Sequence, residues 1–258
     1  MSNVENFVDQ LSDDFKLELF KSSRSGELEK LLTPAPTLDY KLLPSQVPSE
    51  KDWWQFVMLA GRGGGKTFAL TNWVKQKALE NPGSRIALLT RTMRDAEHVV
   101  EQLMAVHEPH DRPELKLYRT QVVWFNGSTL DINVSENPNN GGRGAQYHYT
   151  AVNEFTTLSK RTDRSGATVL RNLEEQTRLG ERPQMFMTGT PKADPDLRKL
   201  LERAKDPKYK IEVSRGATGD NPALSDKYLN NLLAMYGNNT ELILQEIYGI
   251  YIDDEGIL

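Results

Sequence analysis

The run Ala-Gly-Arg-Gly-Gly-Gly-Lys-Thr at residues 60–67 constrains the fold more than any other feature of the chain. The apolar run 56–59 before it predicts a short buried strand, and residues 68–74 after it predict a helix. Few loops need four glycines followed by a lysine and a hydroxyl unless backbone N–H groups must turn inward around an anion. The sequence therefore predicts a strand, a phosphate-binding loop and a helix, which is the context of a P-loop.

The positions of this loop have separate chemical roles. Lys66 is expected to reach the β- and γ-phosphates of a nucleotide, and Thr67 to ligate Mg²⁺. The start of the following helix adds a favourable dipole. The loop departs from the pattern G-x-x-x-x-G-K-[ST] because Ala60 replaces the first glycine, but alanine is small enough for the turn to survive. The predicted phosphate-binding residues are Gly61, Arg62, Gly63, Gly64, Gly65, Lys66 and Thr67.

Composition limits the class of protein. With 38% hydrophobic and 26% charged residues, the 258-residue chain is expected to be soluble and globular, with room for one large α/β domain and a small appendage. It has no apolar run near the roughly 20 residues that a membrane span needs and no signal-peptide pattern. The absence of cysteine excludes disulfides and zinc–thiolate sites, and His107 and His110 are expected to be solvated loop residues. A net charge of −4 does not indicate nucleic-acid affinity over the whole surface, which leaves only a local basic patch.

Apolar runs and helical periodicity alternate along the chain. Strands are predicted at 56–59, 86–89, 116–118, 122–125, 130–134, 147–152, 184–188 and 211–213, and helices at 66–80, 95–106, 169–178, 225–236 and 240–248. A polar helical appendage is predicted over residues 1–43, and several prolines mark the connection to the core. Strands that alternate with helices, several of them apolar throughout, predict an α/β fold whose mainly parallel sheet is covered on both faces.

A second group of polar residues follows the predicted strand 147–152. Glu154 can orient and deprotonate an attacking water. The residue before such a glutamate is normally an aspartate that holds Mg²⁺ through water, and Asn153 lacks this charge, although its oxygen can still accept one hydrogen bond from a metal-bound water. The alternative is that both residues simply begin a polar loop. Thr188 or Thr190, after the next buried strand, could sense the γ-phosphate, or could belong to an ordinary turn.

Two arginines lie in or near the glycine loop and the Glu154 segment in the sequence. Arg62 lies inside the glycine loop, from where it could cover the triphosphate or pair with Glu154. Arg143 lies in the glycine-rich stretch 139–144, from where it could reach the nucleotide of a neighbouring subunit and neutralise the charge that develops on the transferring phosphoryl group. A solvated loop charge is an equally good interpretation of Arg143.

In their order along the chain, these motifs resemble the ATPase region of the large terminase of tailed bacteriophages, the DNA-packaging motor. The resemblance covers the chain from about residue 44 to the C-terminus. The stretches that carry it, besides the glycine loop, are Asp52–Trp54, Arg85–Thr92, Arg143–Gln146, Leu179–Gln184, Thr188–Pro191, Thr218–Pro222 and Gln245–Gly249. The resemblance implies an additional-strand P-loop ATPase core at residues 44–216, followed by a lid and a linker at 217–258.

The resemblance also implies roles for single residues. Lys66 and Thr67 would bind phosphate and Mg²⁺, Glu154 would be the catalytic glutamate, and Arg143 the arginine finger that acts on a neighbouring subunit. The remaining implied site residues are Arg62 as the P-loop arginine, Asn153 at the metal, Thr188 in the coupling segment and, as a weaker candidate, Gln46 at the adenine. Gln46 is equally well explained as a loop glutamine.

The implied cofactors are ATP and Mg²⁺. The implied partners are double-stranded DNA, the portal protein, the small terminase subunit and further copies of the chain in a ring, typically a pentamer, at the procapsid portal vertex in the host bacterial cytoplasm. Because the chain stops where the family's nuclease domain should begin, no nuclease activity is expected from these residues.

Two other functions compete with this one. A helicase-type ATPase would need a second RecA-like half, for which 258 residues leave no room. A nucleotide-binding assembly subunit without turnover is consistent with Asn153, which lacks the charge of the usual aspartate. Glu154 argues against this function, because a site without turnover has little use for a carboxylate that orients water. The sequence locates DNA contacts poorly, since basic clusters are usually solvated surface. The one candidate cluster consists of Lys160, Arg161, Arg164, Arg171 and Arg178.

Overall fold

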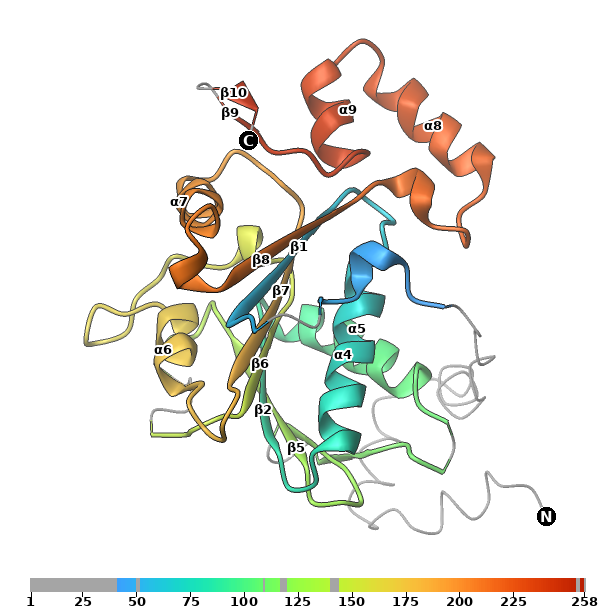
Figure 1. Ribbon diagram of the computed structural model, residues 1–258. Coiled ribbons are helices and arrows are strands. Elements are labelled where there is room, and N and C mark those ends of the chain that lie inside the picture. Colours follow the sequence, from blue (N-terminus) through green and yellow to red (C-terminus); the bar gives the residue numbers. More distant parts are fainter. Residues whose placement is uncertain are drawn as a thin grey trace, which may run out of the picture. The chain divides into compact units, whose positions relative to one another are not determined.

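Six mutually parallel strands form most of an eight-stranded sheet (Figure 1). The structure, a computed structural model, describes residues 41–49, 52–108, 110–116, 120–139, 144–253 and 256–257. The strands are β1 (Gln55–Ala60), β2 (Arg85–Thr90), β3 (Glu114–Lys116), β4 (Gln121–Val123), β5 (Thr129–Val134), β6 (Tyr149–Val152), β7 (Gln184–Gly189) and β8 (Ile211–Gly216). Their order in the sheet is β3-β4-β5-β2-β6-β7-β1-β8, and only β3 and β4 pair antiparallel with their neighbours.

The position of β7 identifies the type of sheet. It lies between β1 and β6 and pairs in parallel with both, so that Met187 is opposite Val57 on one side and Val152 on the other. The strand before the glycine loop is thus separated by one added strand from the strand before Glu154. This confirms the predicted additional-strand P-loop fold. Because the carboxyl ends of parallel strands share one edge, the loops after β1, β6 and β7 meet there.

Helices cover both faces of the sheet. On one face lie α4 (Lys66–Glu80) and α5 (Met93–Ala105), and on the other lie α6 (Val169–Gln176) and α7 (Pro195–Ala204) (Figure 1). Two further helices, α8 (Asp226–Tyr236) and α9 (Thr240–Glu246), follow β8, with the short hairpin β9 (Ile252–Asp253) and β10 (Gly256–Ile257) after them. The 3-10 turns η1 (Pro44–Gln46) and η5 (Thr218–Asp220) flank the core.

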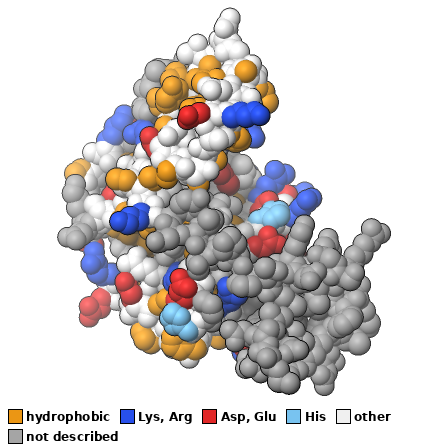
Figure 2. Space-filling view, turned by 90° about the vertical axis from the view of Figure 1, so that its right-hand side faces the viewer, with side chains coloured by type: hydrophobic (Ala, Val, Ile, Leu, Met, Phe, Trp, Pro, Cys, Tyr) orange, Lys and Arg blue, Asp and Glu red, His pale blue; other side chains and the backbone are white. Residues whose placement is uncertain are grey.

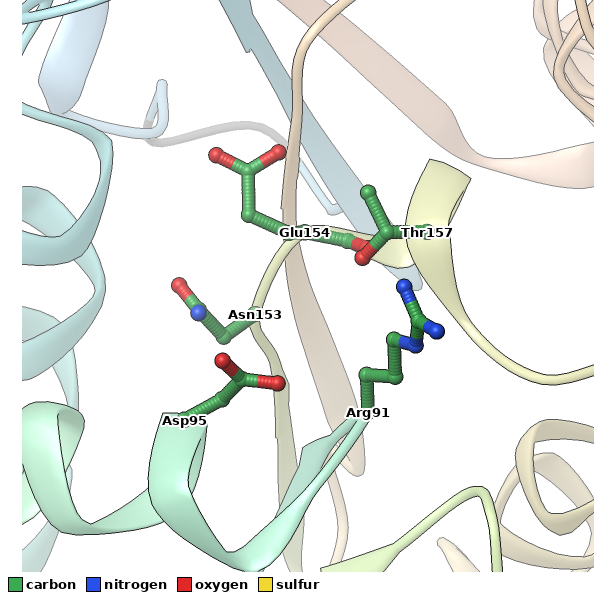
Figure 3. A pocket seen from close by; sticks show the side chains of 5 residues that line it. All are labelled: Arg91, Asp95, Asn153, Glu154 and Thr157. Carbon is green, nitrogen blue, oxygen red and sulfur yellow. The ribbon is translucent and has the colours of Figure 1, made fainter.

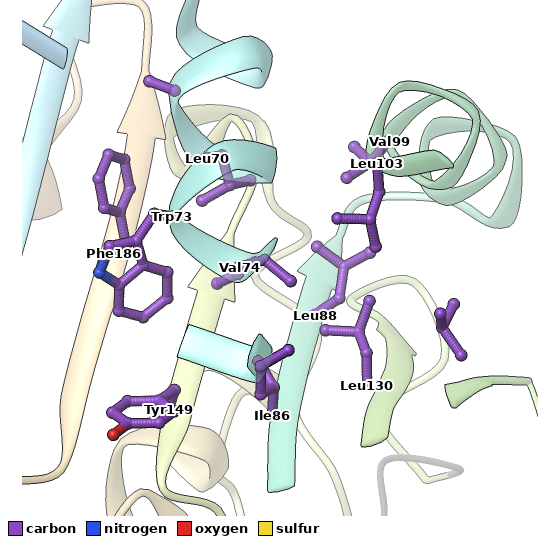
Figure 4. Packing of buried hydrophobic residues seen from close by; sticks show 14 of the residues in the cluster. Leu70, Trp73, Val74, Ile86, Leu88, Val99, Leu103, Leu130, Tyr149 and Phe186 are labelled. Carbon is purple, nitrogen blue, oxygen red and sulfur yellow. The ribbon is translucent and has the colours of Figure 1, made fainter. Parts of the chain in front are cut away.

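Alternate side chains of the central strands fill two separate hydrophobic cores. Phe56 and Met58 of β1 pack on the α4–α5 side, whereas Val57 and Leu59 pack on the α6–α7 side. This two-residue alternation with every position buried explains why the strand is apolar throughout. Trp73 of α4 packs against Tyr149 and Phe186 in the first core (Figure 4). Truncating a buried tryptophan to alanine costs about 3–5 kcal/mol, so this core contributes strongly to stability.

The helix α4 begins and ends where the sequence predicted, at residues 66 and 80. The sequence analysis missed α7, although its start carries a clear signal. Asp194 caps it by accepting hydrogen bonds from the N–H groups of Asp196 and Leu197, and Pro195 occupies the first turn. An N-cap aspartate followed by proline is a common helix start. Its apolar side chains Leu197 and Leu201 are buried in the second core.

The prediction for His107 was wrong, whereas His110 is exposed as expected. The His107 ring is fully buried: its Nδ1 lies 2.6 Å from the Leu103 carbonyl, and its Nε2 accepts a hydrogen bond of 2.9 Å from the Trp124 indole. Burial lowers the pKa of His107, and an acceptor role for Nε2 requires the neutral ring with the proton on Nδ1. The histidine is therefore a core residue that connects α5 to the hairpin β4–β5.

The predicted appendage at 1–43 lies outside the described residues, apart from 41–43, and the lid at 217–258 stays a prediction. Hydrophobic side chains gather at the top of the face in Figure 2, over the C-terminal helices. The exposed large hydrophobic side chains of α8 and α9 include Tyr228, Met235 and Leu242. Of the helices in the described ranges, none is both long enough and apolar enough to cross a membrane.

Candidate active site

The glycine loop connects the end of β1 to the start of α4. Gly63 and Gly65 have φ angles of 74° and 75°, in the left-handed region that side chains other than glycine rarely adopt. The alanine at position 60 is accommodated because position 64 carries no side chain: a Cβ there would lie 2.9 Å from the Cβ of Ala60. Thr67, the second residue of α4, is half-buried at the helix start. The loop thus makes a tight turn from β1 into α4 despite the missing first glycine.

Lys66 links this loop to the end of β6. Its ammonium group donates to the carbonyl oxygens of Ala60 and Gly61, both at 3.0 Å, and lies 3.3 Å from Oε1 of Glu154. Only 8% of the lysine side chain is exposed, against 29% of the glutamate side chain. Lys66, rather than Arg62, is therefore the cation that pairs with Glu154.

Glu154 is held in place from the neighbouring strand. Its backbone is left-handed, with φ and ψ near 50° and 55°, a conformation that costs energy for a residue with a Cβ. Its N–H donates to Thr188 Oγ1 at 3.2 Å, and its Oε2 accepts from the Thr190 N–H at 3.1 Å. The hydroxyl of Thr188 also donates to Oδ1 of Asn153 at 3.4 Å. Both threonines at the end of β7 thus contact the acidic segment.

A cavity of about 280 Å³ opens beside this segment. It is lined by Arg91, Asp95, Asn153, Glu154 and Thr157 (Figure 3). Asp95 was not among the residues that the sequence singled out, although it follows β2, which pairs with β6. Arg91 is bound to Glu136 at 3.2 Å.

The binding of a metal ion at this edge of the sheet would require a nucleotide to supply further ligands. Among the described residues, no group of three or more histidine or acidic side chains could hold one alone. Mg²⁺ usually takes one or two protein ligands and completes its shell with phosphates and water. The hydroxyl of Thr67, the amide oxygen of Asn153 and the carboxylate of Glu154 are oxygen donors of this kind, so the residues present fit Mg²⁺ bound together with a nucleotide.

The first half of the glycine loop is bound to the C-terminal helices. The Nε of Arg62 donates to Glu246 Oε2 at 2.8 Å, and the Arg62 N–H donates to the Glu246 carbonyl at 2.7 Å. The Thr218 hydroxyl donates to the Arg62 carbonyl at 2.8 Å, and the Asn221 amide to the Gly63 carbonyl at 2.6 Å. Glu246 raises the pKa of Arg62 through its hydrogen bond and its charge. Glu246 lies in the stretch Gln245–Gly249 that carries the resemblance, but the sequence analysis gave it no role at the glycine loop.

Gln46 covers the second half of the loop. Its amide nitrogen donates to the carbonyl oxygens of Gly65 at 3.3 Å and Gly64 at 3.5 Å, and its Oε1 accepts from the Leu43 N–H at 2.8 Å. A Cβ at position 65 would collide with the Gln46 amide. This buried glutamine therefore packs on the glycine loop.

Arg143 lies outside the described residues. In the basic cluster, Lys160 is bound to Asp194 and Asp196, and Arg171 lies 3.3 Å from Glu175. These local pairs neutralise part of the cluster, which weakens its case as a DNA contact.

Solved structures with similar folds are large terminases. A point mutant of the isolated ATPase domain from Thermus phage P74-26 matches at 15% identity and a TM-score of 0.60, covering 85% of this chain and 99% of that one. The large terminase of a thermophilic bacteriophage, in complex with ADP, matches at 12% identity and a TM-score of 0.62, covering 85% and 51%. The HK97 bacteriophage large terminase matches at 14% identity and a TM-score of 0.60, covering 81% and 50%.

The chain thus spans nearly all of the isolated ATPase domain and about half of the two longer terminase chains. At these identities, the similarity establishes the fold. A comparison with curated proteins finds no match. A family model described as "Terminase large subunit, T4likevirus-type, N-terminal" matches residues 57–258, from within β1 onward to the C-terminus. Because this match covers well over half of the chain, the protein belongs to the family of terminase large subunits, in their N-terminal region.

Proposed function

We propose that the chain hydrolyses ATP and that this hydrolysis drives double-stranded DNA into a viral procapsid. The observation that carries the proposal is the distance of 3.3 Å between the Lys66 ammonium and the Glu154 carboxylate. A phosphate-binding lysine and a carboxylate able to activate water converge at one edge of the sheet, although β7 separates their strands. Family membership and the ADP complex of the thermophilic phage's large terminase support the choice of nucleotide.

The chemistry follows from the placement of these groups. The glycine loop would surround the phosphates with N–H donors, and Lys66 would neutralise their charge. Mg²⁺, when bound to ATP, would neutralise further charge on the β- and γ-phosphates, and Thr67 and Asn153 would hold it. A bound γ-phosphate would compete with the Glu154 carboxylate for the ion pair with Lys66. The hydrogen bond from the Thr190 N–H would still hold the Glu154 carboxylate in position. Glu154 would then orient a water molecule and accept its proton.

Four further residues have proposed roles. Arg143 would enter the site of a neighbouring subunit and stabilise the charge on the transferring phosphoryl group. Arg62 would act on the triphosphate of its own subunit, and Gln46 would contact the adenine. The Thr188 hydroxyl accepts a hydrogen bond from the Glu154 N–H. Thr188 would thereby couple the presence or absence of the γ-phosphate to β7.

The proposed motor is a ring of copies of this chain, typically a pentamer. Its other partners would be the portal protein, the small terminase subunit and double-stranded DNA, and it would work at the portal vertex of the procapsid in the host cytoplasm. The terminase family supports this setting.

Phosphate release at high protein concentration tests the enzyme. Glu154→Ala should lower the rate by about 100-fold or more, because general-base catalysis contributes about 10²–10⁴-fold. Labelled ATP should still bind to the variant, since the glycine loop and Lys66 are intact. Equal rates for the wild type and the variant would contradict the proposal.

A mixing experiment tests the role of Arg143. Arg143→Ala alone should lose turnover but keep nucleotide binding. When it is mixed with Glu154→Ala, a site at the interface can combine Glu154 from one subunit with Arg143 from the other, so turnover should partly return. Failure to recover any turnover, with mixed assembly shown by cross-linking, would place Arg143 in its own subunit's site.

Asn153 favours a second candidate, a nucleotide-binding assembly subunit without turnover. This candidate predicts saturable ATP binding and no phosphate release at any protein concentration. A helicase-like ATPase instead predicts strand separation, which a duplex-unwinding assay would detect.

A further inference from the structure

Asp95 is a carboxylate in the candidate active site for which the proposed mechanism has no use. It lies in the first turn of α5, directly after β2. β2 pairs in parallel with β6, with Leu89 opposite Val152, so the residues that follow these two strands meet at the same edge of the sheet. Asp95 and Asn153 accordingly line the same cavity, and Figure 3 shows them next to each other on one side of it.

The helix cap fixes the position of this carboxylate. Oδ2 of Asp95 accepts hydrogen bonds from the Thr92 N–H at 3.1 Å and from the Thr92 hydroxyl at 2.8 Å. The Thr92 hydroxyl in turn accepts from the Asp95 N–H at 3.2 Å. The cap engages Oδ2, and no group in the described ranges hydrogen-bonds Oδ1, which remains for a ligand in the cavity. A carboxylate held this way needs little further ordering when a ligand arrives.

The charges around the cavity single out Asp95. Glu154 is paired with Lys66, and Arg91 is paired with Glu136. Within the described ranges, no lysine, arginine or histidine forms an ion pair with Asp95. Asp95 therefore brings to the cavity a negative charge that is not paired with a cation from the described part of the chain.

We infer that Asp95 supplies the negative charge that Asn153 lacks and thereby positions the hydrated Mg²⁺ that accompanies ATP. Asn153 offers a neutral oxygen at the position usually held by an aspartate, and Asp95 adds a carboxylate beside it from the first turn of α5, the helix that follows the neighbouring strand β2. Partners that act through metal-bound water can change metal affinity by about 10–100-fold. This inference rests on the proposed function, and Asp95 acts as a positioning residue.

The substitution Asp95→Asn tests the inference because it removes the charge but keeps an oxygen for the helix cap. The quantity to measure is the Mg²⁺ concentration that gives half-maximal binding of fluorescently labelled ATP, in buffers from EDTA to millimolar Mg²⁺. We expect this concentration to rise by about 10-fold in Asp95→Asn, while binding in EDTA stays unchanged. The double variant Asp95→Asn/Asn153→Asp should return to the wild-type value. An unchanged Mg²⁺ dependence in folded Asp95→Asn would overturn the inference.

Asn153→Asp alone gives a second test that leaves the helix cap untouched. If Asp95 already supplies the charge, this variant should lower the Mg²⁺ requirement by less than about 3-fold, whereas a site without a supporting carboxylate should gain about 10-fold or more. The larger gain would overturn the inference. Failure of the proposed function looks different, because the wild type itself would then show no saturable binding of ATP at any Mg²⁺ concentration.

Discussion

The two cations of the glycine loop are bound by carboxylates from different parts of the molecule. Lys66 is 8% exposed and pairs with Glu154, which follows the central strand β6. Arg62 has 59% of its side chain exposed and pairs with Glu246 at the end of α9. One end of the loop is thus connected to the centre of the sheet and the other to the C-terminal helices.

This difference indicates that one pair serves the reaction and the other attaches the loop to the C-terminal helices. A nearly buried lysine beside a backbone-strained glutamate is typical of a site where charge is placed for a reaction. An exposed arginine paired with a carboxylate contributes little to stability, because water screens the charge. We therefore expect changes at the Lys66–Glu154 pair to affect turnover and changes at the Arg62–Glu246 pair to affect mainly how the loop is attached.

The largest expected effect is on turnover at the first pair. Glu154→Gln keeps the size of the side chain and an oxygen for Thr190 but removes the base. Single-turnover rates of ATP cleavage should fall by about 10²–10⁴-fold. If Glu246→Gln lowered the same rate as strongly, the distinction between the two pairs would be wrong.

Backbone conformation gives the next largest effect. Gly65 and Gly83 both have positive φ angles, but a Cβ meets the Gln46 amide at position 65 and nothing within 4 Å at position 83. Gly83→Ala should lower the free energy of unfolding by about 1–2 kcal/mol, the cost of a left-handed alanine. Gly65→Ala should cost more, since Gln46 must also move. Urea denaturation of both variants measures the difference, and equal losses would show that Gln46 does not pack firmly on the loop.

A smaller effect is expected at the second pair. Glu246→Gln keeps the shape of the side chain but removes the charge next to Arg62. Because the arginine is more than half exposed, the free energy of unfolding should fall by about 1 kcal/mol or less. Thermal unfolding in low and high salt would check this, since the wild type should lose the same increment when salt is added. A loss well above this value would mean that the C-terminal helices depend on this pair for folding.

The smallest effect at neutral pH involves neither pair. Burial lowers the pKa of His107 in the folded protein below the value of about 6.5 in the unfolded chain. Only the unfolded chain then binds the proton readily, so stability is complete above pH of about 6.5 and is lost as the pH falls below it. Urea unfolding between pH 5 and 7.5 should show this slope in the wild type and in His110→Gln, but a weaker one in His107→Gln. If the pH dependence of the free energy of unfolding were unchanged in His107→Gln, it would arise from groups other than His107.

The sequence predicted the local elements better than the connections between them. The bounds of α4 can be predicted from local sequence, because the glycine loop marks its start and the Asn-Pro-Gly stretch at 81–83 marks its end. The family resemblance implied an additional-strand fold, but the order of strands, with β7 between β1 and β6, was not predicted, since local patterns do not encode which strands are neighbours.

The same limit applies to the candidate site. The glycine loop and Glu154 are local motifs and could be predicted. Asp95 and Glu246 reach the site only through tertiary folding, and a helix cap or a helix-end glutamate has no sequence signature of function. His107 was mistaken for a solvated residue because its burial depends on Trp124, which is distant in sequence.

The binding of labelled ATP in the presence of Mg²⁺ tests the central claim most directly. The account predicts a saturable signal for the wild type, a loss of affinity of about 100-fold or more in Lys66→Ala, and continued saturable binding in Glu246→Gln, which lies outside the phosphate loop. No saturable signal in the wild type, or an intact signal in Lys66→Ala, would contradict the claim that residues 60–67 bind a nucleotide.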